Sequence, residues 1–213
     1  MTRKRVAILI SGRGSNMAAL IEAAKAVDYP AEIAVVISNR PDAAGLTRAN
    51  AAGIPTAVVD HRPYGEDREA FERALQAVLE AHRIDLVCLA GFMRLLSPWL
   101  VERWQGRMLN IHPALLPAFK GLDTHRRALT AGAKTHGATV HLVVADVDSG
   151  PIVVQEVIPV AESDTVETLS ARVLELEHRI YPQALRLLAQ GRVRITEGGC
   201  GTEAPEEKSG PAI

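Results

Sequence analysis

An asparagine and a histidine stand two residues apart in the segment MLNIHP at positions 108–113. On an extended strand such side chains emerge on the same face, and Pro113 keeps the chain extended as it leaves the strand. An amide donor beside an imidazole suits a reaction that forms an oxyanion and moves a proton. Asn110 and His112 are therefore candidate catalytic residues. The alternative is that both side chains only satisfy backbone groups of the following loop.

Two carboxylates lie in the segment ADVDSGP at positions 145–151, directly after a run rich in valine. A carboxylate beside an imidazole raises the pKa of the imidazole and fixes its tautomer. Asp146 or Asp148 is therefore a candidate partner of His112, one that would keep it protonated. An Asp in such a loop also often bonds its own backbone, and sequence separation alone does not place either carboxylate near His112.

A glycine-containing segment, SGRGSN at positions 11–16, falls between the first expected strand and the first expected helix. Glycines allow a sharp turn and a close approach of the backbone to a ligand, and we expect Ser15 or Asn16 to cap the helix, whose N-terminus attracts an anion. The segment lacks the Gly-Lys-Ser/Thr of a P-loop and the third glycine of the dinucleotide fingerprint. It therefore favours a monophosphate over ATP or NAD, with a plain capped turn as the alternative.

The elements that must position these residues alternate between strands and helices. The helix expected at 66–82 has apolar residues on one face, and the strand expected at 85–89 is apolar on both faces, which is typical of a parallel sheet covered by helices. We expect strands at 5–10, 32–38, 56–60, 85–89 and 108–111, alternating with helices at 17–27, 44–52, 66–82, 98–104 and 124–131.

The alternation changes after residue 131. Strands expected at 138–144 and 152–160 are joined only by the loop at 145–151, which favours neighbouring antiparallel strands. A last helix at 165–190 carries a buried stripe at alternating spacings of four and three, made by Leu169, Val173, Leu176 and Ile180. The predicted fold class is a single-domain, Rossmann-like α/β fold with a mostly parallel twisted sheet and an antiparallel portion near the C-terminal half.

Composition narrows the class of protein. With 47% hydrophobic residues the chain can bury a full core, and its two cysteines are too few for a disulfide framework and lack metal-ligand spacing, so we expect no metal. The net charge is −1 without a basic stripe, and the N-terminal apolar run is too short for a signal or a membrane span. We expect a cytoplasmic protein with no nucleic-acid or membrane partner. Residues 1–196 should form the domain and residues 197–213 a disordered acidic tail.

Taken together, these motifs resemble the phosphoribosylglycinamide formyltransferases over about residues 5–195. The likeness rests on the order and spacing of six segments, which is far more specific than any one of them. They are SGRGSN at 11–16, AGFMRLLSP at 90–98, NIHP at 110–113, HGATVH at 136–141, DVDSGP at 146–151 and EHRIYP at 177–182.

The resemblance implies a formyl transfer from 10-formyltetrahydrofolate, a co-substrate, to the amine of 5'-phosphoribosylglycinamide in de novo purine (IMP) biosynthesis. Formylglycinamide ribonucleotide and tetrahydrofolate would be the products, small molecules the only substrates, and a monomer or homodimer the working form. It assigns catalysis to Asn110, His112 and Asp148, phosphoribosylglycinamide binding to Gly14, Ser15, Asn16 and Glu177, and folate binding to Arg68, Met93, Arg94, Leu95, Leu96 and Asn110.

Some of these assignments have plain structural alternatives. Arg68 opens a helix and is as consistent with a solvated side chain, while the residues from Met93 to Leu96 also fit a core segment. Ala114 and Asp123 depart from the family, which often has Ser and sometimes His there, without touching the catalytic three. The resemblance also predicts a cis Leu116–Pro117 bond, which a tight loop between two prolines favours.

Three other functions fit part of the sequence. Methionyl-tRNA formyltransferase shares the Asn-x-His pair and distant Asp but has a basic second domain, and formyltetrahydrofolate hydrolase has an N-terminal regulatory domain; on its length we expect this chain to be neither. A non-catalytic nucleotide-binding module would use only residues 11–16. That reading leaves Asn110, His112 and Asp148 unexplained.

Overall fold

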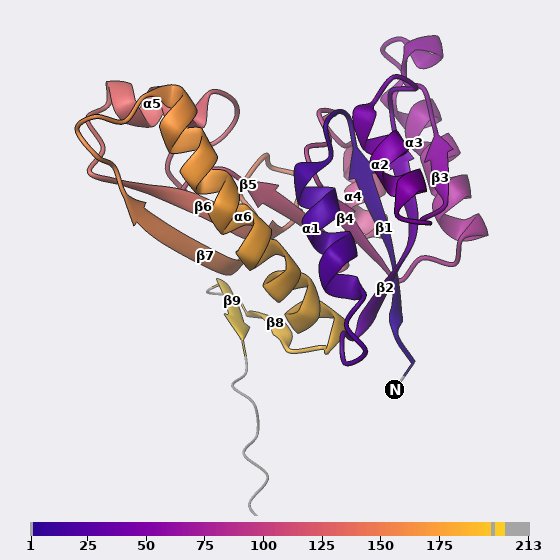
Figure 1. Ribbon diagram of the computed structural model, residues 1–213. Coiled ribbons are helices and arrows are strands. Elements are labelled where there is room, and N and C mark those ends of the chain that lie inside the picture. The colour runs from indigo at the N-terminus through magenta and orange to yellow at the C-terminus, as the bar shows by residue number, and fades with distance from the viewer. Residues whose placement is uncertain (1, 197–198, 203–213) are drawn as a thin grey trace, which may run out of the picture.

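A seven-stranded sheet with strand order β3-β2-β1-β4-β5-β6-β7 forms the centre of the protein, whose computed structural model describes residues 2–196 and 199–202 (Figure 1). The strands are β1 (Lys4–Ile10), β2 (Ala31–Ser38), β3 (Thr56–Val58), β4 (Leu86–Leu89), β5 (Met108–His112), β6 (Thr135–Leu142) and β7 (Ile152–Pro159). The helices are α1 (Ser15–Ala24), α2 (Ala44–Ala51), α3 (Arg68–Ala81), α4 (Pro98–Arg103), α5 (Thr124–Thr130) and α6 (Val166–Ala189), with a short 3-10 turn at Arg62–Tyr64.

The sheet changes direction at β5. Strands β1 to β5 pair in parallel, whereas β6 pairs antiparallel to β5, and β7 antiparallel to β6. This confirms the predicted Rossmann-like fold class with its antiparallel portion. Since β1 lies between β2 and β4, the strand order reverses there, and open α/β sheets bind ligands outside the carboxyl ends of the strands at such a point.

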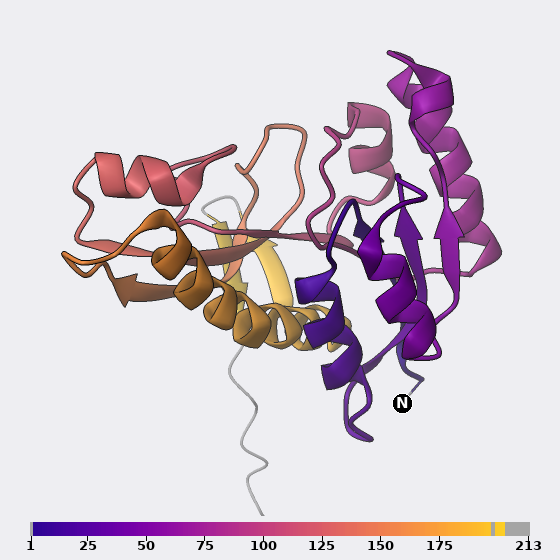
Figure 2. The ribbon, with the colours of Figure 1, turned by 45° about the horizontal axis from the view of Figure 1, so that its top comes forward.

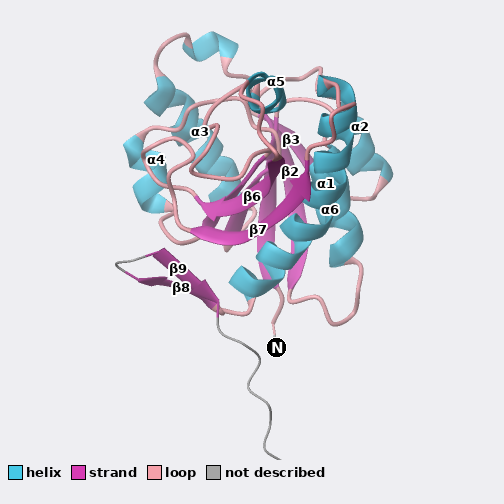
Figure 3. Ribbon diagram, turned by 90° about the vertical axis from the view of Figure 1, so that its left-hand side faces the viewer, coloured by secondary structure: helices cyan, strands magenta, loops and turns pink. Residues whose placement is uncertain are grey.

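Helices cover both faces of the sheet. Helices α1, α2 and α6 pack on one face and α3 and α4 on the other, as Figure 3 shows from the side. Leu109 and Ile111 of β5 belong to the core under α6, while Met108 belongs to the core under α3 and α4. Because side chains alternate along a strand, Asn110 and His112 emerge on the face of Met108, opposite to α6.

Helix α6 crosses the sheet diagonally beside α1 (Figure 1). It begins with a capping box in which Thr165 and Thr168 each bond the other's backbone N–H, and Pro182 lies inside it. The predicted buried stripe is confirmed, since none of its side chains is more than 4% exposed: Leu169, Val173, Leu176 and Ile180. The helix therefore closes the core beneath the central strands.

The C-terminal end differs from the expectation. A hairpin pairs β8 (Val193–Thr196) with β9 (Gly199–Thr202), so regular structure continues past residue 196, where a disordered tail was expected. Two strands pair through backbone hydrogen bonds, which need no apolar stripe. Because the sequence has no apolar stripe here, its periodicity does not predict this hairpin. The other residues of the expected tail, 197–198 and 203–213, lie outside the described part. Within the described part, no helix has the length and apolar character to cross a membrane.

Candidate active site

The carboxyl end of β5 brings Asn110, His112 and Asp148 together. Nδ1 of His112 lies 3.3 Å from Oδ2 of Asp148, and Nδ2 of Asn110 lies 3.5 Å from Oδ1 of the same carboxylate. The side chains of His112 and Asp148 are only 6% and 9% exposed. Of the two carboxylates that the sequence left open, it is Asp148 that contacts His112.

The loop after β6 holds Asp148 in this place. Its backbone takes a positive φ of 49° at Asp148, and the Gly121 N–H donates to Oδ2 at 2.9 Å. A Cβ on Gly150 would lie 1.7 Å from the carbonyl oxygen of Leu142, so only glycine lets the loop return this close to β6. Figure 2 shows this loop and the loop after β4 rising above β5, and both line one cavity.

Burial and Asp148 act in opposite directions on the pKa of His112. Desolvation lowers the pKa of His112 below its usual value, and the carbonyl of Phe119, 3.0 Å from Nε2, and the Asp148 carboxylate oppose this shift without reversing it. Asp148 thus raises the pKa of His112, as expected, but its effect does not outweigh that of burial. The sequence shows the neighbouring carboxylate but not the depth at which the ring is buried.

His141 belongs to this cluster, although no role was predicted for it from the sequence. Its Nδ1 lies 2.9 Å from the carbonyl oxygen of Leu142, which only accepts, so the ring proton sits on Nδ1. Nε2 then accepts from Nδ2 of Asn110 at 3.1 Å. The signal that would have found His141 is strand register, because it stands directly opposite Asn110 on the antiparallel neighbour β6.

Of the two Nδ2 hydrogens of Asn110, one is bonded to a protein acceptor and the other has only a weak contact. His141 accepts one Nδ2 hydrogen, while the contact with Asp148 is at the limit of a hydrogen bond. Burial raises the pKa of Asp148, but its contacts with His141, the Gly121 N–H and His112 outweigh this and leave the pKa lowered. An ionised carboxylate therefore stands between the amide and the imidazole.

The segment 11–16 forms the turn into α1. The helix cap is Gly14, with a positive φ of 71°, and a Cβ on it would lie 3.0 Å from the Cα of Gly45. The expectation that Ser15 or Asn16 caps α1 is wrong, because no side chain bonds the cap and Asn16 turns to α6 instead. The first N–H groups of α1 therefore have no side-chain acceptor and are available to an anion.

Asn16 donates through Nδ2 to Oε2 of Glu177 at 2.5 Å, across a separation of 161 residues. Both residues are only 8% exposed, and Oδ1 of Asn16 has no partner among the described residues. Burial raises the pKa of Glu177, while the bond from Asn16 acts against this. The predicted substrate residues Asn16 and Glu177 are thus in direct contact.

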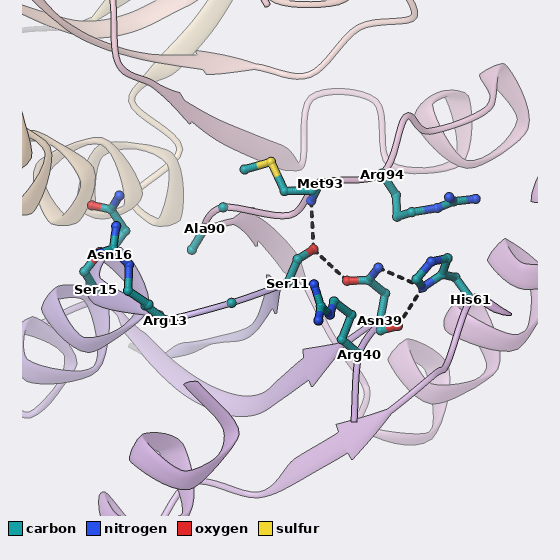
Figure 4. A pocket seen from close by; sticks show the side chains of 13 residues that line it. Ser11, Arg13, Ser15, Asn16, Asn39, Arg40, His61, Ala90, Met93 and Arg94 are labelled. Carbon is teal, nitrogen blue, oxygen red and sulfur yellow. Dashed lines mark hydrogen bonds between the residues drawn. The ribbon is translucent and has the colours of Figure 1, made fainter. Parts of the chain in front are cut away.

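A hydrogen-bond chain joins this turn to the segment after β4 (Figure 4). The hydroxyl of Ser11 donates to Oδ1 of Asn39 at 2.6 Å and accepts from the N–H of Met93 at 2.8 Å. The amide of Asn39 lies 3.1 Å from Nδ1 of His61. These residues line a cavity of about 420 Å³ with Gly14, Ser15 and Asn16.

The predicted folate-binding segment is a rim and not a core segment. Met93 is 67% and Leu95 59% exposed, which removes the alternative of core packing for these two, while Leu96 is partly buried and packs against the core under α3 and α4. A cavity of about 250 Å³ is lined by five of the six predicted folate residues, namely Arg68, Arg94, Leu95, Leu96 and Asn110. Met93, the sixth, lines the neighbouring cavity of about 860 Å³, which also contains Asn110, His112 and Asp148.

Shared lining residues connect the three cavities. Arg13, Gly91 and Met93 line both the cavity at the 11–16 turn and the one at His112, and Arg94 lines all three. The predicted site residues other than the buried Glu177 thus border one continuous cleft. The residues described by the structure include no group of three or more His, Cys, Asp or Glu side chains placed to hold a metal ion. The Leu116–Pro117 bond beside this cleft is cis, which confirms that prediction.

Comparisons with known proteins agree with this arrangement. Residues 4–185 match the family described as formyl transferase. The chain is 43% identical to the phosphoribosylglycinamide formyltransferase of Haemophilus influenzae, covering 91% of each protein. It is 53% identical over 197 residues to the trifunctional purine biosynthetic protein adenosine-3 of Bos taurus, but spans only 19% of its length. Glycinamide ribonucleotide transformylase 1 from Symbiobacterium toebii has the same fold, with a TM-score of 0.90, 48% identity and 94% of each chain covered.

Proposed function

The chain belongs to the phosphoribosylglycinamide formyltransferases of the formyl transferase family, and we propose that it transfers the formyl group of 10-formyltetrahydrofolate to the amine of 5'-phosphoribosylglycinamide. The products would be formylglycinamide ribonucleotide and tetrahydrofolate, in purine biosynthesis. The observation that carries the proposal is the meeting of Asn110, His112 and Asp148 in a cleft continuous with the turn at 11–16. One region offers groups for acyl transfer and the other a place for a phosphate.

The phosphorylated substrate would bind at the start of α1. The uncapped N–H groups and the positive end of the helix dipole attract its phosphate through the backbone of Gly14, Ser15 and Asn16. Glu177, which the resemblance assigns to the glycinamide part, lies behind Asn16 and would hold the Asn16 amide in place for that part of the substrate. Because these groups lie on two different elements, phosphate and amine are fixed at the same time.

The formyl donor would occupy the rim between the loops after β4 and β6. Arg68 and Arg94 supply positive charge for the carboxylates of a folate, and the apolar Leu95 and Leu96 cover its rings. The backbone N–H and C=O groups of residues 94–96 would bond the heteroaromatic ring, since the N–H of Met93 is already bonded to Ser11. The formyl group would then lie between this rim and Asn110.

The reaction forms a bond from the substrate amine to the formyl carbon and breaks the bond from that carbon to the folate nitrogen. The second Nδ2 hydrogen of Asn110 donates to the oxyanion that forms when the amine attacks, because His141 already fixes the rest of the amide. A donor of this kind contributes about 10²–10³ in rate. The leaving nitrogen keeps the electron pair of the broken bond.

His112 would carry the proton from the attacking amine to the leaving folate nitrogen. Burial favours the neutral ring before reaction, so the ring is able to accept a proton. When it becomes charged, Asp148 faces Nδ1 and the carbonyl of Phe119 faces Nε2, and both stabilise the imidazolium next to the oxyanion. The chain thus returns to its starting state after one turnover without a covalent intermediate.

We propose further that the protein acts as a monomer or homodimer in the cytoplasm, on small molecules and not on nucleic acid or membranes. The near-neutral net charge of −1 supports the absence of a nucleic-acid partner. The residues after the β8–β9 hairpin would not be needed for activity.

A formyl-transfer assay with purified protein tests the function. The protein is incubated with 10-formyltetrahydrofolate and, in parallel, with phosphoribosylglycinamide, initiator tRNA charged with methionine, or water alone as acceptor. Tetrahydrofolate should form rapidly only with phosphoribosylglycinamide. Equal rates with water alone would instead identify a hydrolase, and transfer only to tRNA would identify the other formyltransferase activity.

A further inference from the structure

Tyr181 is a fully buried tyrosine in the middle of α6, with 0% exposure. Its hydroxyl lies 2.9 Å from the carbonyl oxygen of Leu89 and 3.2 Å from that of Leu109, and donates to this pair of main-chain acceptors. Burial raises the pKa of Tyr181 well above its usual value, so the hydroxyl keeps its proton at any pH at which the protein is assayed. A side chain of the closing helix is therefore bonded to the backbone of two central strands.

Both carbonyls border Asn110. The carbonyl of Leu109 belongs to the peptide group that contains the Asn110 nitrogen, and Leu89, the last residue of β4, stands opposite Asn110 in the β4–β5 register. Leu109 faces the core under α6, so the hydroxyl reaches this peptide from the face opposite to the Asn110 side chain. Tyr181 itself lines none of the three cavities of the cleft.

The same helix carries Glu177 one turn before Tyr181. Residues four apart lie on one face of a helix, and Glu177 bonds Asn16 at the turn into α1. Helix α6 is therefore attached at one turn to the place proposed for the phosphorylated substrate, and at the next to the strand that carries the proposed oxyanion donor.

We propose that Tyr181 is a positioning residue for the transfer reaction: its hydroxyl fixes the Leu109–Asn110 peptide, and with it the Asn110 amide, relative to the substrate held through α6. The inference rests on the proposed function. Reactions of this type depend steeply on geometry, and a displacement of about 1 Å costs about 10²-fold in rate. The hydroxyl therefore contributes to turnover without touching a substrate.

The chain offers a matched control in Tyr29. This tyrosine is also buried, at 3% exposure, and its hydroxyl also donates to a main-chain carbonyl, that of Pro182, at 2.7 Å. Its acceptor lies on α6 and not on a catalytic strand. Removing the Tyr181 hydroxyl deletes its contacts with two strand carbonyls, and removing the Tyr29 hydroxyl deletes one bond to Pro182, the residue next to Tyr181 on α6. Only Tyr181→Phe loosens the peptide before Asn110.

The experiment compares Tyr181→Phe and Tyr29→Phe with the wild-type protein. We expect kcat to fall about 10- to 100-fold in Tyr181→Phe with KM for both substrates within about threefold, and kcat of Tyr29→Phe to stay within about twofold. Both variants should lose similar thermal stability. Incorporation of 3-fluorotyrosine at position 181 keeps the ring and the donor and should restore kcat to within about twofold of wild type.

A second readout is independent of turnover. In ¹⁵N-edited NMR spectra of the unliganded protein, Tyr181→Phe should shift the side-chain amide signals of Asn110, and Tyr29→Phe should leave them in place. The inference is overturned if Asn110 signals and kcat are unchanged in folded Tyr181→Phe, or if both tyrosine variants lose kcat equally.

The two failures stay distinguishable. A wild-type protein that transfers no formyl group to phosphoribosylglycinamide refutes the proposed function, while the NMR comparison still decides whether Tyr181 orients Asn110. If Tyr181→Phe does not fold, 3-fluoro- and 3,5-difluorotyrosine at position 181 replace it. The hydroxyls of these two fluorotyrosines differ in donor strength. If the side-chain amide signals of Asn110 differ between the two proteins accordingly, the inference is supported, and if the signals are identical, it is refuted.

Discussion

The two sides of the cleft are built differently. At the end of β5, His112 and Asp148 are 6% and 9% exposed and bond fixed partners, whereas Met93 and Leu95 on the opposite rim are 67% and 59% exposed. The rim is tied to the rest of the molecule mainly by backbone, such as the N–H of Met93 on Ser11. Side chains that transfer a proton or stabilise an oxyanion need hydrogen-bond partners that are in place before the substrate binds. Side chains that only bind a ligand can form their contacts when the ligand arrives. Substitutions on the two sides should therefore fail in different ways.

The largest effect is expected at the buried side, from Asp148→Asn. Loss of the carboxylate removes the charge that opposes desolvation, so the pKa of His112 falls further and the imidazolium loses its partner in the transition state. We expect kcat to fall about 10²–10⁴-fold, most strongly at neutral and higher pH. The measurement is the rate as a function of pH for both proteins.

Three related variants sharpen this result. His112→Asn alone and the double variant should be about equally impaired, since residues that act as one unit are not additive. Asn110→Ala should lower turnover with an unchanged pH dependence, because an amide does not titrate. If Asp148→Asn leaves both rate and pH profile as in wild type, the carboxylate serves only its loop.

The next effect is expected at the turn into α1. Ser15→Glu places a negative charge where the N–H groups and dipole of α1 attract the phosphate, and should weaken phosphoribosylglycinamide binding about tenfold or more, the equivalent of about 1.4 kcal/mol. Folate binding should be nearly intact. Calorimetric titration with each ligand separates the two, and Ser15→Ala is the matched control for the lost side chain. Equal losses for both ligands would mean that the turn has another role.

A smaller effect concerns stability and pH on the buried side. Burial lowers the pKa of His136, on β6 and bonded to His125, from 6.5 to about 4. A depressed pKa means that the unfolded chain binds the proton more readily, so stability is fully present above about pH 6.5 and falls as the pH drops towards 4. Between pH 7 and 5 the free energy of unfolding should drop by about 1–3 kcal/mol through the buried histidines together.

Urea unfolding at several pH values measures this drop. In His136→Gln the drop in the free energy of unfolding should be smaller than in wild type. The control is Leu95→Ala, a substitution at an exposed rim residue that removes no histidine, and it should show the same drop as wild type. A pH-independent free energy of unfolding in this range would contradict the burial of neutral histidines.

The smallest effect is expected on the rim, from Leu95→Ala. With 59% of the residue already exposed, stability should change by no more than about 0.5 kcal/mol. The lost apolar contact with the folate should raise KM for the formyl donor about 3- to 10-fold at unchanged kcat. Steady-state kinetics checks the split, and a fall in kcat without a change in KM would show that the rim also takes part in positioning.

Local signals in the sequence predicted much of this protein. The period-2 and period-3.6 patterns gave the strands and helices to within a few residues, including the stripe of α6 and the loop that joins two antiparallel strands. Spacing alone placed Asn110 and His112 on one face of β5, and glycines marked the turn at 11–16. The cis bond at Leu116–Pro117 was predicted from the family resemblance together with the two prolines of the loop. These features follow from backbone geometry, which neighbouring residues determine.

Contacts between distant segments were decided only by the tertiary structure. Strand register set His141 opposite Asn110, and the return of the β6–β7 loop selected Asp148 over Asp146 as the partner of His112. Asn16 does not cap α1 but bonds Glu177, 161 positions away, and burial outweighs Asp148 in its effect on the pKa of His112. Register and desolvation depend on how whole elements pack, and no local stretch of sequence contains that information.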